Sequence, residues 1–376
     1  MDYMDGKIYD GRIQWLDAMR GFTMLMVVAY HTELLAFQET EKTSAAMTLL
    51  VLFRMPLFFF VSGFLAYSSR FAATLGDMAA LVWKKVRIQV LPTLVFLCAY
   101  IVIRKTGFAN CFMQAMRSPM KWGYWFTWVL LQMFLIYYAF AFVEQRLGWK
   151  RKSWGWMPVV AFWVLSLVAY ETAYMPRWFS YPKSQFMATT SIIQTIRYMH
   201  FFLFGNIVRR HWDTAQRVFS HPLFFPLLAA TAFLCCSDFL RWHTLRFMWT
   251  NLPRTLGMYS TMLIVVMFFR HYASSFTSDK PVGAMLQYIG KRTLDVYLLH
   301  YIFMPKMPFV GQWLNANRPN FVLSITLSLI VALVVTAFCL LASNVLRISP
   351  IFSEYLFGRK PKREGEASAQ TNQMNI

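Results

Sequence analysis

The sequence predicts an all-α fold, a polytopic membrane helix bundle of about ten transmembrane helices with both termini in the cytoplasm. Three observations lead to this prediction. Of the 376 residues, 57% are hydrophobic and 18% aromatic. Only 14% are charged, against about 25% in ordinary soluble domains. Apolar runs long enough to cross a bilayer also recur along almost the whole chain.

The apolar runs define the expected helices, because a spanning helix needs about 20 apolar residues. They fall at 19–38, 47–67, 86–104, 123–143, 154–171, 191–209, 222–240, 252–270, 282–304 and 321–346. Ten spans place both termini on one side. Well over half of the 37 basic residues fall in segments on that side, and the positive-inside rule makes it cytoplasmic.

The net charge of +20 does not indicate a nucleic-acid partner, because the basic residues gather in short loops between the apolar runs. That pattern is typical of topology signals and of contacts with lipid headgroups, so membrane lipids are the expected surroundings. Residues 1–357 are predicted to form one membrane-embedded domain. The polar segment 358–376 is predicted to be a disordered cytoplasmic tail. No His or Cys spacing and no carboxylate cluster indicates a metal site.

The first apolar run carries ionisable side chains at both ends. Asp17 and Arg20 are three residues apart, which allows a pair on the first helical turn. His31 follows Arg20 by eleven residues, so the two side chains share one face, roughly 16 Å apart along the axis. An ionisable group at membrane depth is a functional candidate. The alternatives are a structural ion pair at the start of the helix and a core histidine bonded to a neighbouring helix.

A basic cluster precedes the run at 86–104. Lys84 and Arg87 are three residues apart, with Lys85 between them, and we expect them to project together where the third helix begins. Cations at a helix N-terminus suit a phosphate, with help from the free N–H groups there. The alternative is an orientation signal for that helix.

Further polar side chains in the apolar runs are candidates for contact with an acceptor substrate. Arg54 could meet an anionic or hydroxyl-rich acceptor or extend to the headgroups. Trp125 could stack on a sugar or belong to an interfacial belt. Gln132 is a buried polar group that needs a partner, and Tyr297 offers a hydroxyl. His300 lies in an apolar segment from which it could face the same cavity as His31 or bond a neighbouring helix.

These motifs, taken in order, resemble the integral-membrane acyltransferase type 3 family over residues 12–350. They are the segment 16–21 with Arg20 eleven residues before His31, the segment 55–64, a basic pair before Pro92, Trp125-Phe126, and the segment 290–300. Each motif alone is weak, and their common order makes the resemblance specific.

The resemblance implies transfer of an acyl group, commonly acetyl from acetyl-CoA, to a hydroxyl of an envelope or exported glycan or glycolipid. It implies that Arg20 and His31 are the essential pair. The chemistry of the residues fits this: Asp17 would hold the Arg20 guanidinium in a fixed pose, and His31 would act as a general base or a transient acyl carrier. The family's cytoplasmic Arg-x-x-Arg, implicated in coenzyme A binding, falls on Lys84-x-x-Arg87. Lysine there keeps the charge but loses bidentate phosphate geometry. We expect a protein of the bacterial inner (cytoplasmic) membrane.

Two other functions remain open at this point. A transporter or flippase for a polar or lipid-linked substrate would use Arg20 and His31 along a translocation path. A structural subunit of an envelope-assembly complex would carry out no chemistry. The acceptor, the acyl group and the oligomeric state are open as well. Consumption of a thioester separates the acyltransferase from both alternatives.

Overall fold

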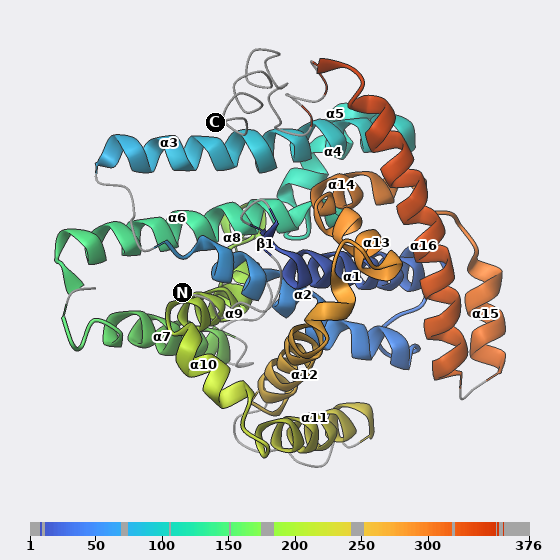
Figure 1. Cartoon of the computed structure of the whole chain (residues 1–376). Helices are drawn as coiled ribbons and strands as arrows, with labels where there is room; N and C mark the ends of the chain where they lie inside the picture. Colours follow the sequence, from blue (N-terminus) through green and yellow to red (C-terminus); the bar gives the residue numbers. More distant parts are fainter. Residues whose placement is uncertain are drawn as a thin grey trace, which may run out of the picture.

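A computed structural model describes residues 8–9, 12–68, 74–104, 107–149, 152–173, 184–241, 252–317 and 320–350, with Phe352 and Leu356. Helices make up nearly all of it (Figure 1). They are α1 Gln14–His31, η1 Thr32–Ala36, α2 Ala45–Ala66, α3 Leu75–Lys85, η2 Val86–Val90, α4 Leu91–Arg104, α5 Phe108–Arg117, η3 Lys121–Gly123, α6 Trp125–Arg146, α7 Met157–Ala173, α8 Gln185–Thr190, α9 Ile192–Arg210, α10 Trp212–Phe219, α11 Phe224–Arg241, α12 Leu252–His271, η5 Ala273–Phe276, α13 Pro281–Gly290, α14 Thr293–Phe303, α15 Pro308–Ala316 and α16 Phe321–Leu346. Within the described ranges, the strands are the antiparallel pair β1 Ile8–Tyr9 and β2 Arg12–Ile13.

The all-helical prediction is confirmed, and most predicted runs coincide with helices. Among the described residues, five helical segments are long and apolar enough to cross a membrane, or six if the pair α10 and α11, bent by 78°, is one span. The five are 45–66, 75–104, 125–146, 252–271 and 321–346. The count of about ten spans and the side on which the termini lie stay predictions. The predicted tail 358–376 is outside the described residues.

Helix α1 lies at the centre of the molecule, where it packs on α2, α12, α13 and α16 (Figure 1). Most of its side chains are buried, as expected of a helix too polar to face lipid. It crosses α13 at two glycines. A Cβ on Gly21 would lie 1.9 Å from the Leu286 carbonyl oxygen, and one on Gly290 would lie 1.8 Å from that of Asp17. Only glycine allows these backbones to approach so closely, a common device of membrane helices.

Helices α2 and α9 cross in the same way. A Cβ on Gly63 would lie 1.8 Å from the Phe202 carbonyl oxygen, and one on Gly205 would lie 2.0 Å from that of Phe60. Ser44 caps α2 by accepting a hydrogen bond from the Met47 backbone N–H. The two glycine crossings therefore hold α1 and α2 against the rest of the bundle.

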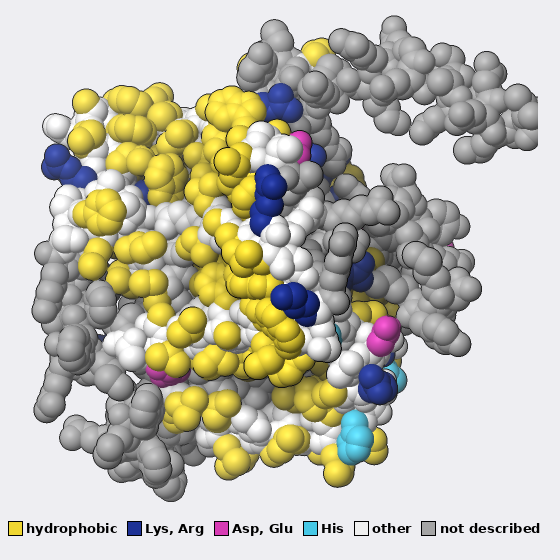
Figure 2. All heavy atoms as spheres, turned by 90° about the vertical axis from the view of Figure 1, so that its left-hand side faces the viewer, with side chains coloured by type: hydrophobic (Ala, Val, Ile, Leu, Met, Phe, Trp, Pro, Cys, Tyr) yellow, Lys and Arg dark blue, Asp and Glu magenta, His cyan; other side chains and the backbone are white. Residues whose placement is uncertain are grey.

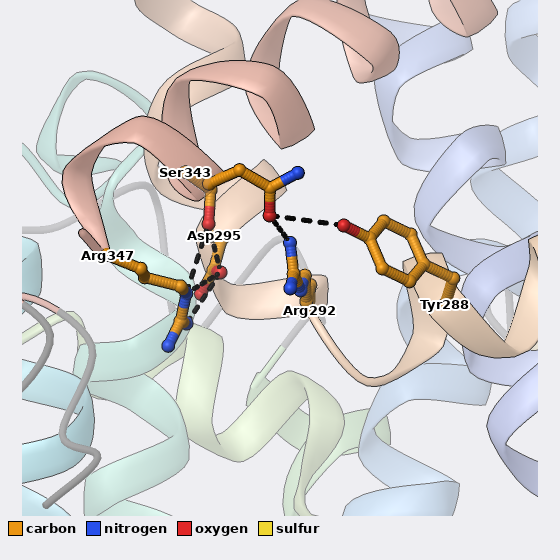
Figure 3. A network of polar contacts seen from close by, with 6 residues as sticks. Tyr288, Arg292, Asp295, Ser343 and Arg347 are labelled. Carbon is orange, nitrogen blue, oxygen red and sulfur yellow. Dashed lines mark hydrogen bonds and ion pairs between the residues drawn. The ribbon is translucent and has the colours of Figure 1, made fainter. Parts of the chain in front are cut away.

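The run predicted as one helix over 282–304 is two helices, α13 and α14, which break at Lys291-Arg292. A network of polar contacts fixes this break to the end of α16 (Figure 3). The buried Asp295 carboxylate accepts from Ser343 at 2.6 Å and from Arg347 at 2.7 Å, while Arg292 donates to Asn344. Because Asp295 lies in the first turn of α14, this network sets the direction of α14.

The expectation that a helix begins between Lys84 and Arg87 is wrong. Helix α3 begins at Leu75 and continues through η2 into α4, as one segment over 75–104. Thr74 and Asp77 form a reciprocal capping box that starts the helix ten residues earlier. The backbone N–H groups at Lys84 and Arg87 are therefore inside a helix and are not free to bind a phosphate.

The exterior is strongly apolar. Figure 2 shows a face on which hydrophobic side chains predominate, with Lys and Arg at separate points and few acidic side chains. Helix α16, at one edge of the molecule in Figure 1, exposes Val322, Leu341 and Val345 by more than half. Such a surface is unfavourable in water and suits a lipid environment.

Candidate functional site

One cavity of about 460 Å³ runs along α1. Arg20 lines it together with Lys85 and Thr293, and His31 lines it together with Tyr30, Arg54 and Tyr301. The α-helical spacing of eleven residues places Arg20 and His31 on the same stripe, and both side chains do line this cavity. A charged group and an imidazole therefore border one internal space.

At one end, Arg20 is held by two neighbours. Its Nη1 donates to the Asp17 carboxylate at 3.1 Å, and its Nη2 donates to the Thr293 hydroxyl at 3.3 Å. Asp17 is buried behind it, and Thr293 is the first residue of α14. The Arg20 side chain is 29% exposed and lines the cavity, so a bound anion could reach it.

At the other end, His31 is the last residue of α1, where the α-helix becomes the π-helix η1. Its Nδ1 lies 3.1 Å from Nε2 of His300, a fully buried side chain on α14. The Nδ1 atom of His300 lies 3.1 Å from the Val296 carbonyl oxygen, one turn earlier on the same helix. The two imidazoles therefore form a chain that ends at a backbone carbonyl.

That carbonyl sets the protonation of both rings. A carbonyl oxygen only accepts, so His300 carries its proton on Nδ1, and Nε2 of the neutral ring is an acceptor. His31 must then donate from its own Nδ1. The lone pair of the neutral His31 ring is on Nε2, the atom that faces the cavity side chain Tyr301. This is the tautomer that a general base or a nucleophilic imidazole needs.

A turn with strained backbone angles, at residues 121–123, contacts the Tyr301 hydroxyl that faces His31. Lys121, Trp122 and Gly123 have φ values of +47°, +51° and +103°. The Gly123 carbonyl accepts from Tyr297 at 2.9 Å. The Tyr301 hydroxyl lies 3.2 Å from both the Gly123 carbonyl oxygen and His31 Nε2, so its single proton can be donated to either acceptor. Two consecutive left-handed residues that are not glycine are costly, and such strain is concentrated at functional sites.

The Lys121 side chain holds this turn. Its ammonium donates to backbone carbonyls on both sides, most closely to Thr189 at 2.6 Å and Met116 at 2.7 Å. These contacts tie the turn to the ends of α5 and α8. The position of the Gly123 carbonyl is therefore fixed by residues outside the cavity.

Replacing Gly123 with alanine is expected to lower the rate of acyl transfer by about 100-fold, because a displacement of about 1 Å at a reacting group has that effect. The new Cβ would lie 2.2 Å from the Tyr301 ring, so this ring must move away from His31. The check is kcat of the purified variant in lipid. Gly148→Ala is the control, since Gly148 also has a positive φ, +64°, but nothing within 4 Å of an added Cβ. Equal activity of the two variants would contradict the prediction.

The Tyr30 ring lies between the Arg54 guanidinium and the His31 imidazole and contacts both. The Arg54 Cζ lies 3.4 Å from the centroid of the Tyr30 ring, and that ring is 5.5 Å from the His31 ring, edge to face. The Tyr30 hydroxyl donates to Glu41 at 3.4 Å. Arg54 is 9% exposed and borders the cavity, so a buried cation stands next to the imidazole.

Only some of the other site residues predicted from the sequence line the cavity. Lys85 borders the cavity, with its ammonium 3.8 Å from the centroid of the Phe134 ring, while Lys84 and Arg87 are not in the lining. Tyr297 borders the cavity, and so does Trp125, which stacks on Tyr198 with centroids 5.7 Å apart.

Gln132 lies outside this cavity lining. Its amide donates to the Thr190 carbonyl at 2.5 Å and accepts from Thr195 at 2.9 Å, so it joins α6 to α8 and α9. The buried amide does find partners, as the sequence led us to expect, but they belong to the protein.

Sequence reasoning missed Tyr301, Thr293 and the Gly123 carbonyl. A usable signal for Tyr301 was its spacing from Tyr297, because residues four apart share one helix face. The Gly123 carbonyl left no comparable signal, since its role depends on a turn whose conformation is set by distant helix ends.

Within the described ranges, no group of three His, Cys, Asp or Glu side chains could hold a metal ion. The cavity is lined instead by three arginines, a lysine, one glutamate, several tyrosine hydroxyls and the His31 imidazole, with His300 bonded behind His31. This predominantly basic set suits an anionic ligand and a proton transfer.

Comparisons with known proteins agree with this chemistry. A relative, Nodulation protein NolL of Sinorhizobium fredii (strain NBRC 101917 / NGR234), is 25% identical over 270 residues, which cover 67% of this chain and 63% of that protein. The match thus spans less than two thirds of the relative. No solved structure matches this one. The family model described as "Acyltransferase domain" matches residues 13–343. The chain is an integral membrane protein of the acyltransferase type 3 family.

Proposed function

We propose that this protein is an acyl-CoA-dependent O-acyltransferase that moves an acyl group, acetyl in the first instance, to a hydroxyl of an envelope or exported glycan or glycolipid. The observation that carries this proposal is the single cavity that joins Arg20 to the Nε2 lone pair of His31. Family membership supplies the reaction class, and the cavity supplies a cation and a base at the two ends of one passage.

Arg20 and Lys85 form the proposed donor end. Coenzyme A is an anionic nucleotide head on a long, flexible arm that ends in a thioester. Arg20 is prepositioned by Asp17 and Thr293, so it can meet a phosphate without reorganising. The path along α1 from Arg20 to His31 is roughly 16 Å, comparable to the reach of such an arm. Lys84 and Arg87 remain proposed donor contacts outside the cavity lining, on either side of the junction between α3 and η2.

The chemistry at the other end follows from the imidazole pair. The acceptor hydroxyl oxygen attacks the thioester carbonyl carbon while His31 Nε2 takes the hydroxyl proton. His31 Nδ1 keeps its proton and its bond to His300, so the imidazolium that forms is held in place. The carbon–sulfur bond then breaks, and the thiolate recovers the proton to give the free thiol. A route through an acyl group on His31 Nε2 needs the same lone pair.

The membrane arrangement is part of the proposal. The donor end faces the cytoplasm, with both termini on that side, about ten spans, and the bacterial inner membrane as the location. Residues 1–357 form the acyltransferase domain and 358–376 a polar cytoplasmic tail. The apolar exterior supports the membrane location (Figure 2), and the basic residues Arg20 and Lys85 at the donor end support the cytoplasmic orientation of that end.

The test is release of thiol from acetyl-CoA by the purified protein in lipid, with and without a crude envelope glycan extract. Wild type should release thiol, and the rate should rise with the glycan. Arg20→Gln should raise the KM for acetyl-CoA by about 10- to 100-fold, the effect of losing a charged hydrogen bond worth about 1.5–3 kcal/mol. Wild type that neither binds nor consumes acetyl-CoA, but moves a glycolipid across the bilayer, would overturn the proposal in favour of a transporter.

A further inference from the structure

Arg54 is a buried cation that makes no direct ion pair among the described residues: its nearby acidic side chain, Glu41, is bonded by the Tyr30 hydroxyl and lines the same cavity. Arg54 lies near the middle of α2, and only 9% of its surface is exposed. In the part of the chain that the structure describes, no ion pair or hydrogen bond of this side chain is recorded, and its Nε is buried without a partner. A charge buried in this way is expensive, which makes a functional role the default hypothesis.

The one close contact of the guanidinium leaves its hydrogen-bond donors free. It stacks on the face of the Tyr30 ring, with Cζ 3.4 Å from the ring centroid. Stacking on an aromatic face stabilises a cation, but it uses none of the five N–H groups at the edge of the guanidinium. Since Arg54 also lines the cavity, those groups are available to a ligand inside it.

Other groups near His31 are already engaged. The Tyr297 hydroxyl donates to the Gly123 carbonyl and accepts from the Phe126 N–H. The Tyr301 hydroxyl lies between Gly123 and His31, and the Tyr30 hydroxyl donates to Glu41. Among these neighbours, Arg54 alone combines a full positive charge with several uncommitted donors.

We infer that Arg54 stabilises the oxyanion of the acyl-transfer intermediate. This rests on the proposed function and adds the group that it lacks. When the acceptor oxygen, or His31 Nε2, adds to the thioester carbonyl carbon, the carbonyl oxygen gains a negative charge, which the Arg54 N–H groups bind. When the oxyanion electron pair re-forms the carbonyl double bond, the carbon–sulfur bond breaks and the sulfur leaves with the negative charge as a thiolate. The thiolate takes a proton from the His31 ring to become the free thiol. Donors already aimed at developing charge are among the largest contributions to catalysis.

The test separates this role from binding of an anionic acceptor. Arg54→Gln and Arg54→Lys are compared with wild type in lipid for three quantities: thiol release with glycan, slow hydrolysis of acetyl-CoA without any acceptor, and binding of a thioether analogue that cannot transfer its acyl group. We expect Arg54→Gln to lower both rates by about 100- to 1000-fold. Arg54→Lys should recover part of this loss, and analogue binding should change by less than about threefold, since the charge acts after binding.

Arg217→Gln is the matched control, because Arg217 is exposed on α10, outside the cavity lining, and its loss removes the same charge. It should retain wild-type rates. If Arg54→Gln raises only the KM for the glycan and leaves acceptor-free hydrolysis unchanged, Arg54 binds an anionic group of the acceptor and the inference is wrong. If Arg54→Gln has wild-type rates throughout, it is also wrong, while the proposed function stands. A wild type without thioester consumption would overturn the proposed function itself.

Discussion

Replacing His300 with phenylalanine is expected to lower kcat for acyl transfer by about 100- to 10,000-fold, close to the loss from removing His31 itself. His300 does not border the cavity, so we treat it as a positioning residue. Its Nε2 accepts the proton of His31 Nδ1, because its own Nδ1 is committed to the Val296 carbonyl. Phenylalanine fills the space but cannot accept that bond, so His31 loses the partner that selects its reactive tautomer.

Two comparisons separate positioning from general loss of structure. His300→Gln offers a side-chain oxygen near the position of Nε2, so it should recover part of kcat, while the KM for acetyl-CoA stays within about threefold in both variants. His200→Phe is the control: His200 is equally buried, bonds Tyr259 at 2.8 Å, and lies outside the cavity lining. It should affect thermal stability but not kcat of the folded protein. Similar kcat losses for His200→Phe and His300→Phe would contradict the assignment.

The pairing of His31 with His300 illustrates how far the sequence can lead. The spacing of Arg20 and His31 on one helix face was sufficient to predict that they share a stripe, because helical geometry is local. That His300 meets His31 depends on the break between α13 and α14 and on the direction the Asp295 network gives to α14. The Asp295 network joins residues 48 and 52 positions apart, and the His31–His300 contact joins residues 269 positions apart, so no local pattern contains them.

The basic segment at Lys84 and Arg87 is the opposite case. Here a local sequence pattern indicated a helix start, but a capping motif earlier in the chain determines where the helix begins. The apolar run beginning at 86 suggested a helix start, whereas the Thr74–Asp77 capping box starts the helix earlier. Helix α3 has no buried residue by itself, so its apolar pattern is weak, yet the cap and its continuity with α4 hold it. The spacing within one helix predicted a shared face, whereas side chains supplied across the bundle, such as Arg54 and His300, could be named as candidates but not placed relative to His31. Tyr301, Thr293 and the Gly123 carbonyl were missed.

Replacing Gly290 with valine is expected to prevent stable folding, and even alanine there should cost at least about 3 kcal/mol, at the upper end for overpacking. A Cβ at this position would lie 1.8 Å from the Asp17 carbonyl oxygen and 3.1 Å from the Gly21 nitrogen. Both are backbone atoms of the central helix, so no side-chain rotation can relieve the clash. Helices α1 and α13 must separate, and the α1 turn that carries Asp17 and Arg20 must move with them.

The measurement is the yield of monodisperse protein in detergent and its melting temperature. Gly76→Ala is the matched control, since its added Cβ would meet only the Thr74 hydroxyl at 3.6 Å. Because alanine favours a helix over glycine by roughly 0.5–1 kcal/mol, that variant should melt at or slightly above the wild-type temperature. If Gly290→Ala melts like Gly76→Ala, α1 and α13 are not in backbone contact. In that case the close packing that fixes Arg20 at one end of the cavity would not exist. A lower melting temperature with a raised KM for acetyl-CoA is the combined result that the packing and the donor site together require.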